Sequence, residues 1–272
     1  MLRLGHRRII PLLITAFWAV MTGSLIYQEV IRPHFGMVTP ARDTTRTMDL
    51  WLGVYSNQST QVGFIHTTST PLIRESEPGA RLAITAHVRL PVLGRTTAAN
   101  LNGKAWLSSE RGLSDFELHL RLDEQEFCAD GVIQDGTLKV TLDMPGQQMP
   151  LEFPVGENPL LSDGLGLTAA NMPLLQPGQT AYLDVFDPVS LSTSKVKLTC
   201  TGVEALTVCG ELVETHRIEM TSGGTVTTVW ATSDEEVVRV DTPFGFQLRK
   251  ITPKEALSFP ARREDSTPDS AA

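Results

Sequence analysis

The chain has 272 residues, of which 41% are hydrophobic, and it carries a formal net charge of −8 at pH 7. That length and apolar content suffice for one large domain or two small ones. The acidic balance makes the surface a poor partner for nucleic acid and for anionic lipid headgroups.

The first segment predicts a membrane anchor. Residues 1–8 hold three arginines, and residues 9–28 open with an uncharged, mostly apolar run that ends at Tyr27. As a helix this run is roughly 28 Å long, close to a hydrocarbon core of about 30 Å. Because the arginines precede it, the positive-inside rule places residues 1–8 in the cytoplasm and the rest of the chain outside the membrane. A cleaved signal peptide and a buried soluble helix are the alternatives.

Residues 29–47 mix charge, proline and threonine, which indicates a linker, and residues 48–257 have the pattern of a β domain. Short runs rich in β-branched and aromatic residues alternate with turn signals such as EPGA, QDGT and SGGT. In DFELHLRL, Phe116 and Leu118 fall on one face and Glu117 on the other. We therefore expect a mainly β fold of about a dozen antiparallel strands, in a large curved sheet or half-barrel with one face exposed to solvent.

The predicted strands lie between the turn signals. They are the runs WLGVYS, QVGFIHTTST, RLAITAHVRL, NGKAWLSS, DFELHLRL, FCADGVIQ, LKVTLDM, MPLEFPV, TAYLDVF, KVKLTCTGV, ETHRIEM, TVTTVWATS, EVVRVDT and FGFQLRKI.

One exported segment has a helical pattern, NPLLSDGLGLTAANMPLL, in which Asn158 and Pro159 can start a helix. Its two central glycines weaken the pattern, so we expect one short helix that plugs the curved sheet. Residues 258–272 are polar with two prolines, which predicts a disordered tail.

The stretch PGQTAYLDVFDPVSLSTSKVKLTC sets two carboxylates beside several hydroxyls, which raises the question of a reactive loop. Pro177 and Gly178 predict a turn, and Asp187 with Pro188 predicts the end of the strand that follows. The Asp187 carboxylate can accept hydrogen bonds from the backbone of the turn that it opens. We interpret the stretch as a structural corner.

Three cysteines are present, Cys128, Cys200 and Cys209. In an oxidising compartment Cys200 and Cys209 could be bridged if they flank a hairpin turn. A buried apolar role for the cysteines is the alternative.

No complete catalytic set, cofactor motif or metal motif is visible. The histidines of the β region lie on separate predicted strands, without the H-E-x-x-H or C-x-x-C spacing of metal sites. A site built from His66, His87, His119 and an acid is conceivable, but imidazoles on the polar face are the simpler interpretation. The G-x-S-x-G signature is absent, and Cys128 and Cys209 have no activating motif. We expect no catalytic residue and no cofactor.

The order of several motifs is more informative. From Asp49 to Leu257 the chain resembles the membrane-anchored, exported β domain that precedes the catalytic module in some bacterial transglutaminase-like proteins, and more distantly the curved sheets of lipoprotein-carrier proteins. The resemblance is carried by GVY and VGF near residues 53–64, PGQ at 177–179, FDP at 186–188 and the strand around Trp230. It implies an accessory domain without its enzyme, since no cysteine here matches the transglutaminase nucleophile.

These inferences predict a non-catalytic binding or accessory module of the bacterial inner membrane, whose main domain is periplasmic. Its expected partners are the membrane, through residues 9–28, and an envelope protein or enzyme. The alternative is a carrier that holds a lipid or acyl chain on the concave face of the sheet. A hydrolase built from scattered histidines and aspartates is a third, weaker candidate.

Overall fold

The computed structural model describes residues 46–56, 59–92, 95–155, 159–162, 173, 175–187 and 191–259. The predicted anchor, nearly all of the linker and the tail, and most of the predicted helix from Asn158 lie outside these residues. Among the helices of the described part, none is both long and apolar enough to cross a bilayer.

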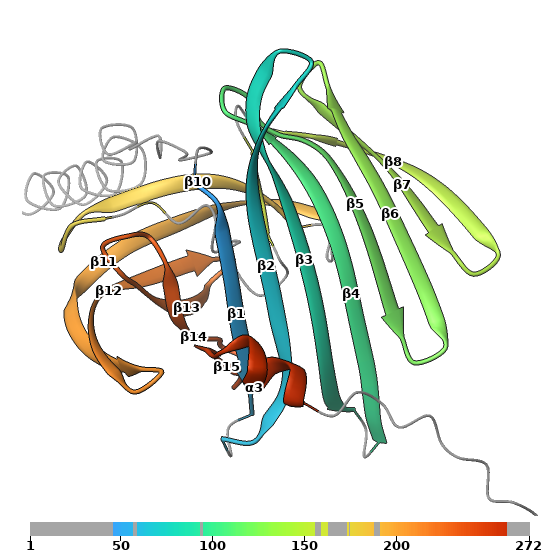
Figure 1. Cartoon of the computed structure of the whole chain (residues 1–272). Helices are drawn as coiled ribbons and strands as arrows, with labels where there is room; N and C mark the ends of the chain where they lie inside the picture. The colour runs from blue at the N-terminus through green and yellow to red at the C-terminus, as the bar shows by residue number, and fades with distance from the viewer. Residues whose placement is uncertain are drawn as a thin grey trace, which may run out of the picture.

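The described chain is mainly β, as the alternating runs predict (Figure 1). Each of those runs is a strand. The bounds are β1 Met48–Tyr55, β2 Gln61–Arg74, β3 Glu77–Val92, β4 Arg95–Ser108, β5 Gly112–Leu122, β6 Gln125–Gln134, β7 Thr137–Met144, β8 Gln147–Pro154, β9 Leu160–Leu161, β10 Thr180–Asp187, β11 Ser192–Val208, β12 Glu211–Ser222, β13 Thr225–Ala231, β14 Val237–Asp241 and β15 Gln247–Lys250.

All these strands belong to one sheet in the order β8-β7-β6-β5-β4-β3-β2-β1-β15-β14-β13-β12-β11-β10-β9. Neighbours are antiparallel, and β1 pairs with β15 through registers such as Leu52 with Lys250. The exception is β9, which pairs in parallel with β10 where Val185 lies opposite Leu160. The sheet is not closed into a barrel, because β8 and β9 are its two ends.

Tight turns explain why so many strands pair with their neighbours in sequence. At Asp135-Gly136, between β6 and β7, both residues have positive φ, 50° and 73°. Two residues in this left-handed region match the twist of a two-residue hairpin, and an Asp-Gly pair adopts it at low cost. The same holds at Gly223 and Gly224, with φ of 55° and 82°.

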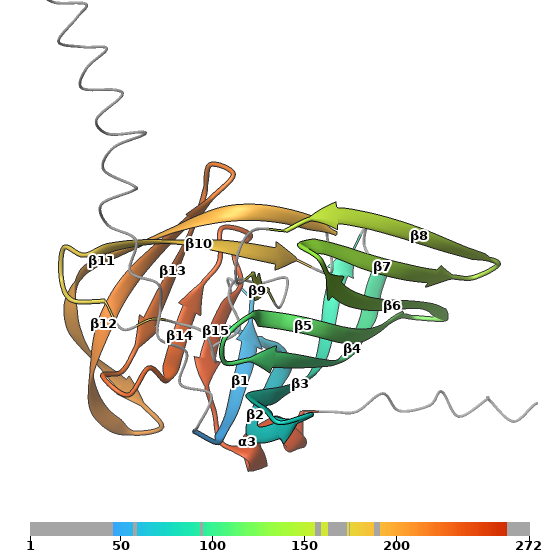
Figure 2. The same ribbon diagram turned by 90° about the horizontal axis from the view of Figure 1, so that it is seen from above.

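The strong curvature of the sheet brings its two halves together (Figure 2). One apolar cluster lines β1, β2 and β10 to β15, and a second lines β3 to β7. Phe186 of β10 belongs to the second cluster, where its ring centroid lies 5.6 Å from that of Phe116 and 5.9 Å from that of Phe153. The backbone N–H of Leu113 on β5 also donates to the carbonyl of Pro159, just before β9, at 3.2 Å. In the described residues, the concave face is therefore lined by packed apolar side chains.

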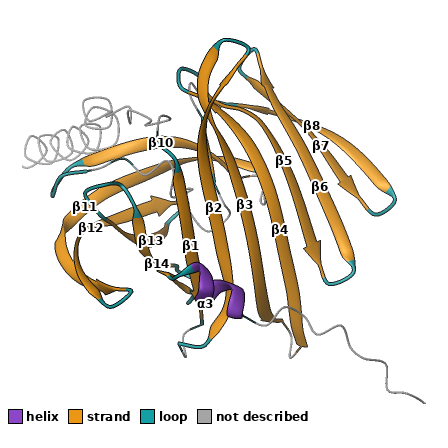
Figure 3. Ribbon diagram, viewed as in Figure 1, coloured by secondary structure: helices purple, strands orange, loops and turns teal. Residues whose placement is uncertain are grey.

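A helix, α3 (Pro253–Ser258), covers the opposite face of β1 and β2 (Figure 3). Ala256 packs there with Phe64 and Ile251. Thr252 caps the helix: its side chain accepts a hydrogen bond from the Glu255 backbone, while the Glu255 carboxylate accepts one from the Thr252 backbone. This short helix is not the one that the sequence predicts.

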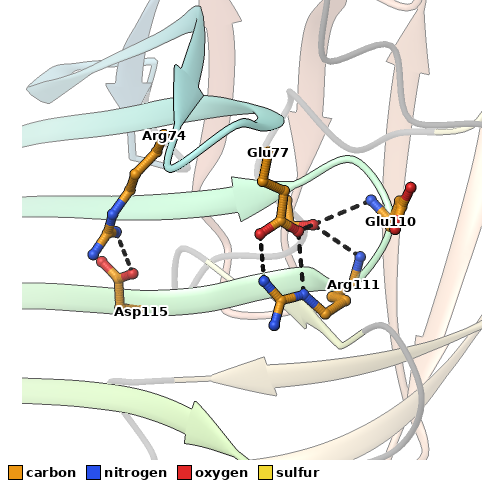
Figure 4. A network of polar contacts seen from close by, with 6 residues as sticks. Arg74, Glu77, Glu110, Arg111 and Asp115 are labelled. Carbon is orange, nitrogen blue, oxygen red and sulfur yellow. Dashed lines mark hydrogen bonds and ion pairs between the residues drawn. The ribbon is translucent and has the colours of Figure 1, made fainter.

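Polar contacts connect the end of β2 to β5, and the start of β3 to the β4–β5 turn (Figure 4). Arg74 and Asp115 form an ion pair at 2.6 Å. Glu77 accepts hydrogen bonds from the Arg111 guanidinium and from the Ser108 hydroxyl. These bonds fix the β4–β5 turn against the start of β3.

Candidate functional site

The hairpin of β11 with β12 bends, and its tip reaches β15. A bulge shifts its register between Cys200 and Gly202. Beyond the bulge the Glu204 carboxylate accepts a hydrogen bond from the indole N–H of Trp230 on β13. At the tip, the Cys209 thiol lies 3.8 Å from the carbonyl oxygen of Lys250 on β15. A bulge bends a strand and increases its twist, so this one directs the hairpin tip over β14 and β15.

A hollow of about 460 Å³ lies beneath that tip. It is lined by Tyr55, Leu206, Thr207, Val208, Cys209, Val238, Arg239, Gln247, Arg249, Lys250, Ile251 and Glu255. The volume is within the range of small-molecule pockets, about 300–1,000 Å³. The lining differs from the apolar concave core, because it includes three cationic side chains.

Two of those cations are neutralised within the chain. The Arg239 guanidinium forms a two-pronged contact with the Asp241 carboxylate, at 2.9 Å and 2.6 Å, and lies 4.5 Å from the Trp230 ring centroid. The Lys250 ammonium lies 2.6 Å from the Glu236 carboxylate. Arg239 and Lys250 therefore already form ion pairs within the chain.

Arg249 is different. Its guanidinium lies 4.9 Å from the Tyr55 ring centroid and donates to the side-chain oxygen of Gln247, and both of these partners are neutral. Among the described residues no carboxylate forms an ion pair with Arg249. The hollow therefore presents a guanidinium that is positioned by an aromatic ring and keeps its charge available.

The electrostatics of the hollow also fix the state of two neighbours. Burial raises the pKa of the Tyr55 phenol, and the positive charge of Arg249 offsets part of that rise. The phenol is therefore protonated at neutral pH and able to donate a hydrogen bond. Hydrogen bonds from the backbone and hydroxyl of Thr252 lower the pKa of Glu255, which is ionised at neutral pH.

The predicted corner is built into β10 and its entry turn. Gly178, with φ of 83°, donates its backbone N–H to the carbonyl of Cys200 at 2.8 Å, and Pro177 precedes it in the same turn. Asp187 is the last residue of β10 and pairs with Ser192, while Pro188 lies outside the described residues. Neither Asp184 nor Asp187 lines the hollow.

The bridge between Cys200 and Cys209 that the sequence left open is not formed, since both thiols are free. Cys200 is fully buried in the core opposite Ile218, whereas Cys209 is exposed in the hairpin turn itself. Nine residues of extended strand separate Cα atoms by roughly 30 Å. A disulfide needs them within about 7 Å.

The histidines do not converge on one site. The His66 ring bonds to Asp49 at 2.7 Å, and the His87 ring bonds to Asn100 at 2.6 Å. The His119 ring bonds to Glu117 at 2.8 Å. The fourth, His216, is buried rather than on the polar face, and its ring nitrogen lies 3.0 Å from the Leu175 carbonyl oxygen.

One contact escaped the sequence interpretation: the His119 ring lies 3.2 Å from the Cys128 thiol. The signal was present, because the two residues are equidistant from the turn at Asp123 and Glu124 and a two-residue hairpin must pair them. The Arg249 hollow had no such local signal, since it joins residues from both ends of the domain.

Comparisons with known proteins give likenesses of shape only. No family model matches the chain, and no curated protein matches it. A β-barrel-like protein of domain of unknown function DUF1849 from Brucella abortus is 10% identical, with a TM-score of 0.49 over 75% of this chain and 97% of that one. A DUF1089 family protein from Pseudomonas aeruginosa is 9% identical, with a TM-score of 0.36 over 66% of this chain and 90% of that one.

Proposed function

We propose that the protein is a non-catalytic binding module, held at the outer side of a bacterial inner membrane by residues 9–28. Its β domain recognises an envelope protein through the hollow at Arg249. The bound segment carries a carboxylate, either a side chain or a chain terminus, that pairs with the Arg249 guanidinium.

The observation that carries this proposal is that Arg249 lies over the Tyr55 ring and has no carboxylate partner among the described residues. A guanidinium stacked on Tyr55 is already oriented, so less side-chain entropy is lost when a carboxylate binds. The protonated Tyr55 phenol adds a donor in the same hollow. Charge-assisted hydrogen bonds of this kind are roughly twice as strong as neutral ones.

The surroundings favour a single carboxylate over a polyanion. Glu255 lines the same hollow, and Glu236 and Asp241 hold the other two cations. The net charge of −8 adds a general repulsion for extended anionic surfaces. A short peptide segment with one well-placed acid avoids most of this repulsion.

Lipid carriage is a second candidate, supported by the apolar concave face. The residues on that face are already packed against each other, and Leu198, Ile218 and Leu175 have no exposed surface. An acyl chain would have to displace side chains that make good contacts with each other, at a cost in packing. For this reason we rank lipid carriage below protein recognition.

Site-specific crosslinking in intact membranes tests the proposal. A photoreactive residue replaces Thr207, an exposed residue of the lining, in the full-length chain. We expect one crosslinked protein in stoichiometric amount, and we expect Arg249→Ala to reduce that product at least tenfold. Arg81→Ala, at an exposed arginine of β3, is the matched control and should leave the product unchanged.

Two outcomes contradict the proposal. One is a product that is equally abundant with Arg249→Ala, and the other is recovery of the bait alone. Mass spectrometry of the purified full-length protein separates the lipid candidate: a co-purifying lipid in stoichiometric amount, with no crosslinked protein, supports carriage instead.

A further inference from the structure

A second group of reactive side chains lies far along the sheet from the Arg249 hollow, on the hairpin of β5 and β6. His119 lies on β5, and Glu126 and Cys128 lie on β6. One potential ligand atom from each of the three falls within 4.8 Å of the other two. Among the described residues this is the group of histidine, cysteine and acidic side chains with spacing suited to a metal ion.

The register of the hairpin holds the group together. His119 pairs directly with Cys128, and Arg121 pairs with Glu126. Opposite residues of an antiparallel pair have Cβ atoms about 5 Å apart, and positions two apart share a face. Phe116 and Leu118 point into the core, so His119, Glu126 and Cys128 project from the other face. The backbone thus presents all three groups on one face of the hairpin.

The hydrogen bonds of His119 assign its two nitrogens. Nδ1 lies 3.2 Å from the Cys128 sulfur, and Nε2 lies 2.8 Å from a carboxylate oxygen of Glu117. A carboxylate on the outer nitrogen holds that nitrogen protonated and leaves the lone pair on the other one. Histidines that ligate metals usually have this carboxylate partner, because it fixes the tautomer and increases ligand basicity.

Cys128, His119 and Glu117 could also be interpreted as a catalytic nucleophile, its base and the group that orients the base. The acidic residues around Cys128 argue against catalysis. Burial raises the pKa of the Cys128 thiol, and the charges of Glu126, Asp143 and Asp130 raise it further. A nucleophilic cysteine needs the reverse, a cationic environment that lowers its pKa. The neighbouring strands also use their backbone N–H groups in the ladder, which leaves no obvious donors for an oxyanion.

We propose that His119 Nδ1, the Cys128 sulfur and a Glu126 carboxylate oxygen bind a divalent transition-metal ion of the zinc type. Imidazole, thiolate and carboxylate are the three ligand types that zinc takes from proteins, and water can complete the tetrahedron. The soft sulfur ligand disfavours Mg²⁺ and Ca²⁺, which prefer oxygen. On binding, the sulfur–metal bond forms and the thiol proton leaves to solvent.

Cobalt(II) is the probe for this site, since it occupies zinc sites and its bond to a thiolate gives a charge-transfer absorption band. The untagged full-length protein, reduced and in detergent, is titrated with Co²⁺ and then with Zn²⁺. We expect one Co²⁺ per chain, a thiolate band that saturates with it, and loss of that band when Zn²⁺ displaces the cobalt.

Variants locate the ligands. Cys128→Ser should abolish the band, and His119→Asn and Glu126→Gln should each weaken binding. Glu117→Gln should weaken it about 10- to 100-fold through its effect on His119. Cys209→Ser and His66→Asn, which remove an exposed thiol and a histidine elsewhere, should leave the band and the stoichiometry unchanged.

The proposal is overturned if Cys128→Ser keeps the wild-type band, or if no saturable binding of one Co²⁺ per chain is found. Misfolding is separated from ligand loss by melting: each variant should match the metal-free wild type. At a fixed Zn²⁺ concentration Cys128→Ser should gain no stability, and the three variants with weakened binding should gain less than the wild type and the two controls. Because the Arg249 hollow is on β14 and β15, Cys128→Ser should retain the Thr207 crosslink. The two proposals therefore fail independently.

Discussion

Glu77 connects three parts of the chain through one carboxylate. It accepts from the Arg111 guanidinium and from the Ser108 hydroxyl, and Ser108 in turn accepts from the Arg111 backbone N–H at 3.0 Å. Ser108 is fully buried, so its hydroxyl depends on this acceptor. Hydrogen bonds from Arg111 and then Ser108 lower the pKa of Glu77.

A lowered pKa in the folded state makes the contribution of Glu77 depend on pH. The charged carboxylate stabilises the fold above the unfolded-state pKa, and the contribution is lost as the pH falls through the lower folded-state pKa. Glu77→Gln keeps an oxygen for Ser108 but loses the charge. We expect it to lower the melting temperature at pH 7, by a deficit that shrinks as the pH falls through the folded-state pKa of Glu77 and the wild-type carboxyl becomes neutral.

Melting curves of the two proteins at a series of pH values from 7 downwards check this expectation. Glu75→Gln, in the exposed turn between β2 and β3, is the control and should melt like the wild type throughout. A deficit of Glu77→Gln that stays constant as the pH is lowered to the point of acid unfolding would show that the charge does not contribute to stability.

At the scale of elements, one side chain of β10 contacts the half of the sheet that lies far from it in the strand order. Phe186 is fully buried and places its ring between Phe116 of β5 and Phe153 of β8. Its neighbours on β10, Leu183 and Val185, belong to the other apolar cluster. The strand therefore joins the two clusters, and Phe186 is its contact with the second.

Phe186→Ala should destabilise the domain by about 3–5 kcal/mol, the cost of a large cavity in a packed core. Denaturant unfolding of the full-length protein measures this loss. Phe244→Ala, at a side chain that is 75% exposed, should change stability by less than about 0.5 kcal/mol. If the two variants unfold alike, Phe186 does not join the clusters.

The local pattern of the sequence predicts the strands but not their long-range pairing. Phe116 and Leu118 alternate with Glu117 and His119, so both the strand and its two faces could be read directly. The strand β9 could not be predicted, because two residues carry no periodicity. The helix α3 could have been predicted from the sequence, since Thr252 and Glu255 have the spacing of a capping box and a proline lies between them.

The same distinction applies to the two candidate sites. His119 and Cys128 follow from one hairpin, and their pairing needed only the turn to be counted. Tyr55 and Arg249 meet because β1 pairs with β15, and Cys209 reaches them because of the bulge after Cys200. Those contacts are set by the pairing of strands from opposite ends of the domain, on which a window of sequence carries no information.

For the molecule as a whole, the thiols can report on which side of the membrane the β domain lies. Cys209 is exposed in a hairpin turn, and Cys200 is fully buried. Cys128 is partly buried with a raised pKa, so it has little reactive thiolate at neutral pH. We expect a membrane-impermeant maleimide to label intact spheroplasts mainly at Cys209 if the domain is exported.

Cys209→Ser should remove most of that labelling at pH 7, and raising the pH should reveal slower labelling of Cys128. Lysed spheroplasts provide the control for total accessible thiol. Labelling that appears only after lysis would place the domain in the cytoplasm and contradict the predicted export.

The end strands of the sheet affect whether the protein self-associates. The strand β8 is one end, and a strand with an unpaired edge can template the addition of another chain. It carries Pro150 and Pro154, which lack a backbone N–H, with the charged Glu152 between them. A strand that paired with this edge would lack hydrogen-bond donors at the two prolines, and it would bury the Glu152 carboxylate without a partner. We therefore expect the two tertiary amides and the carboxylate to keep this edge from pairing with other chains, and replacing both prolines should favour fibrous or swapped assemblies.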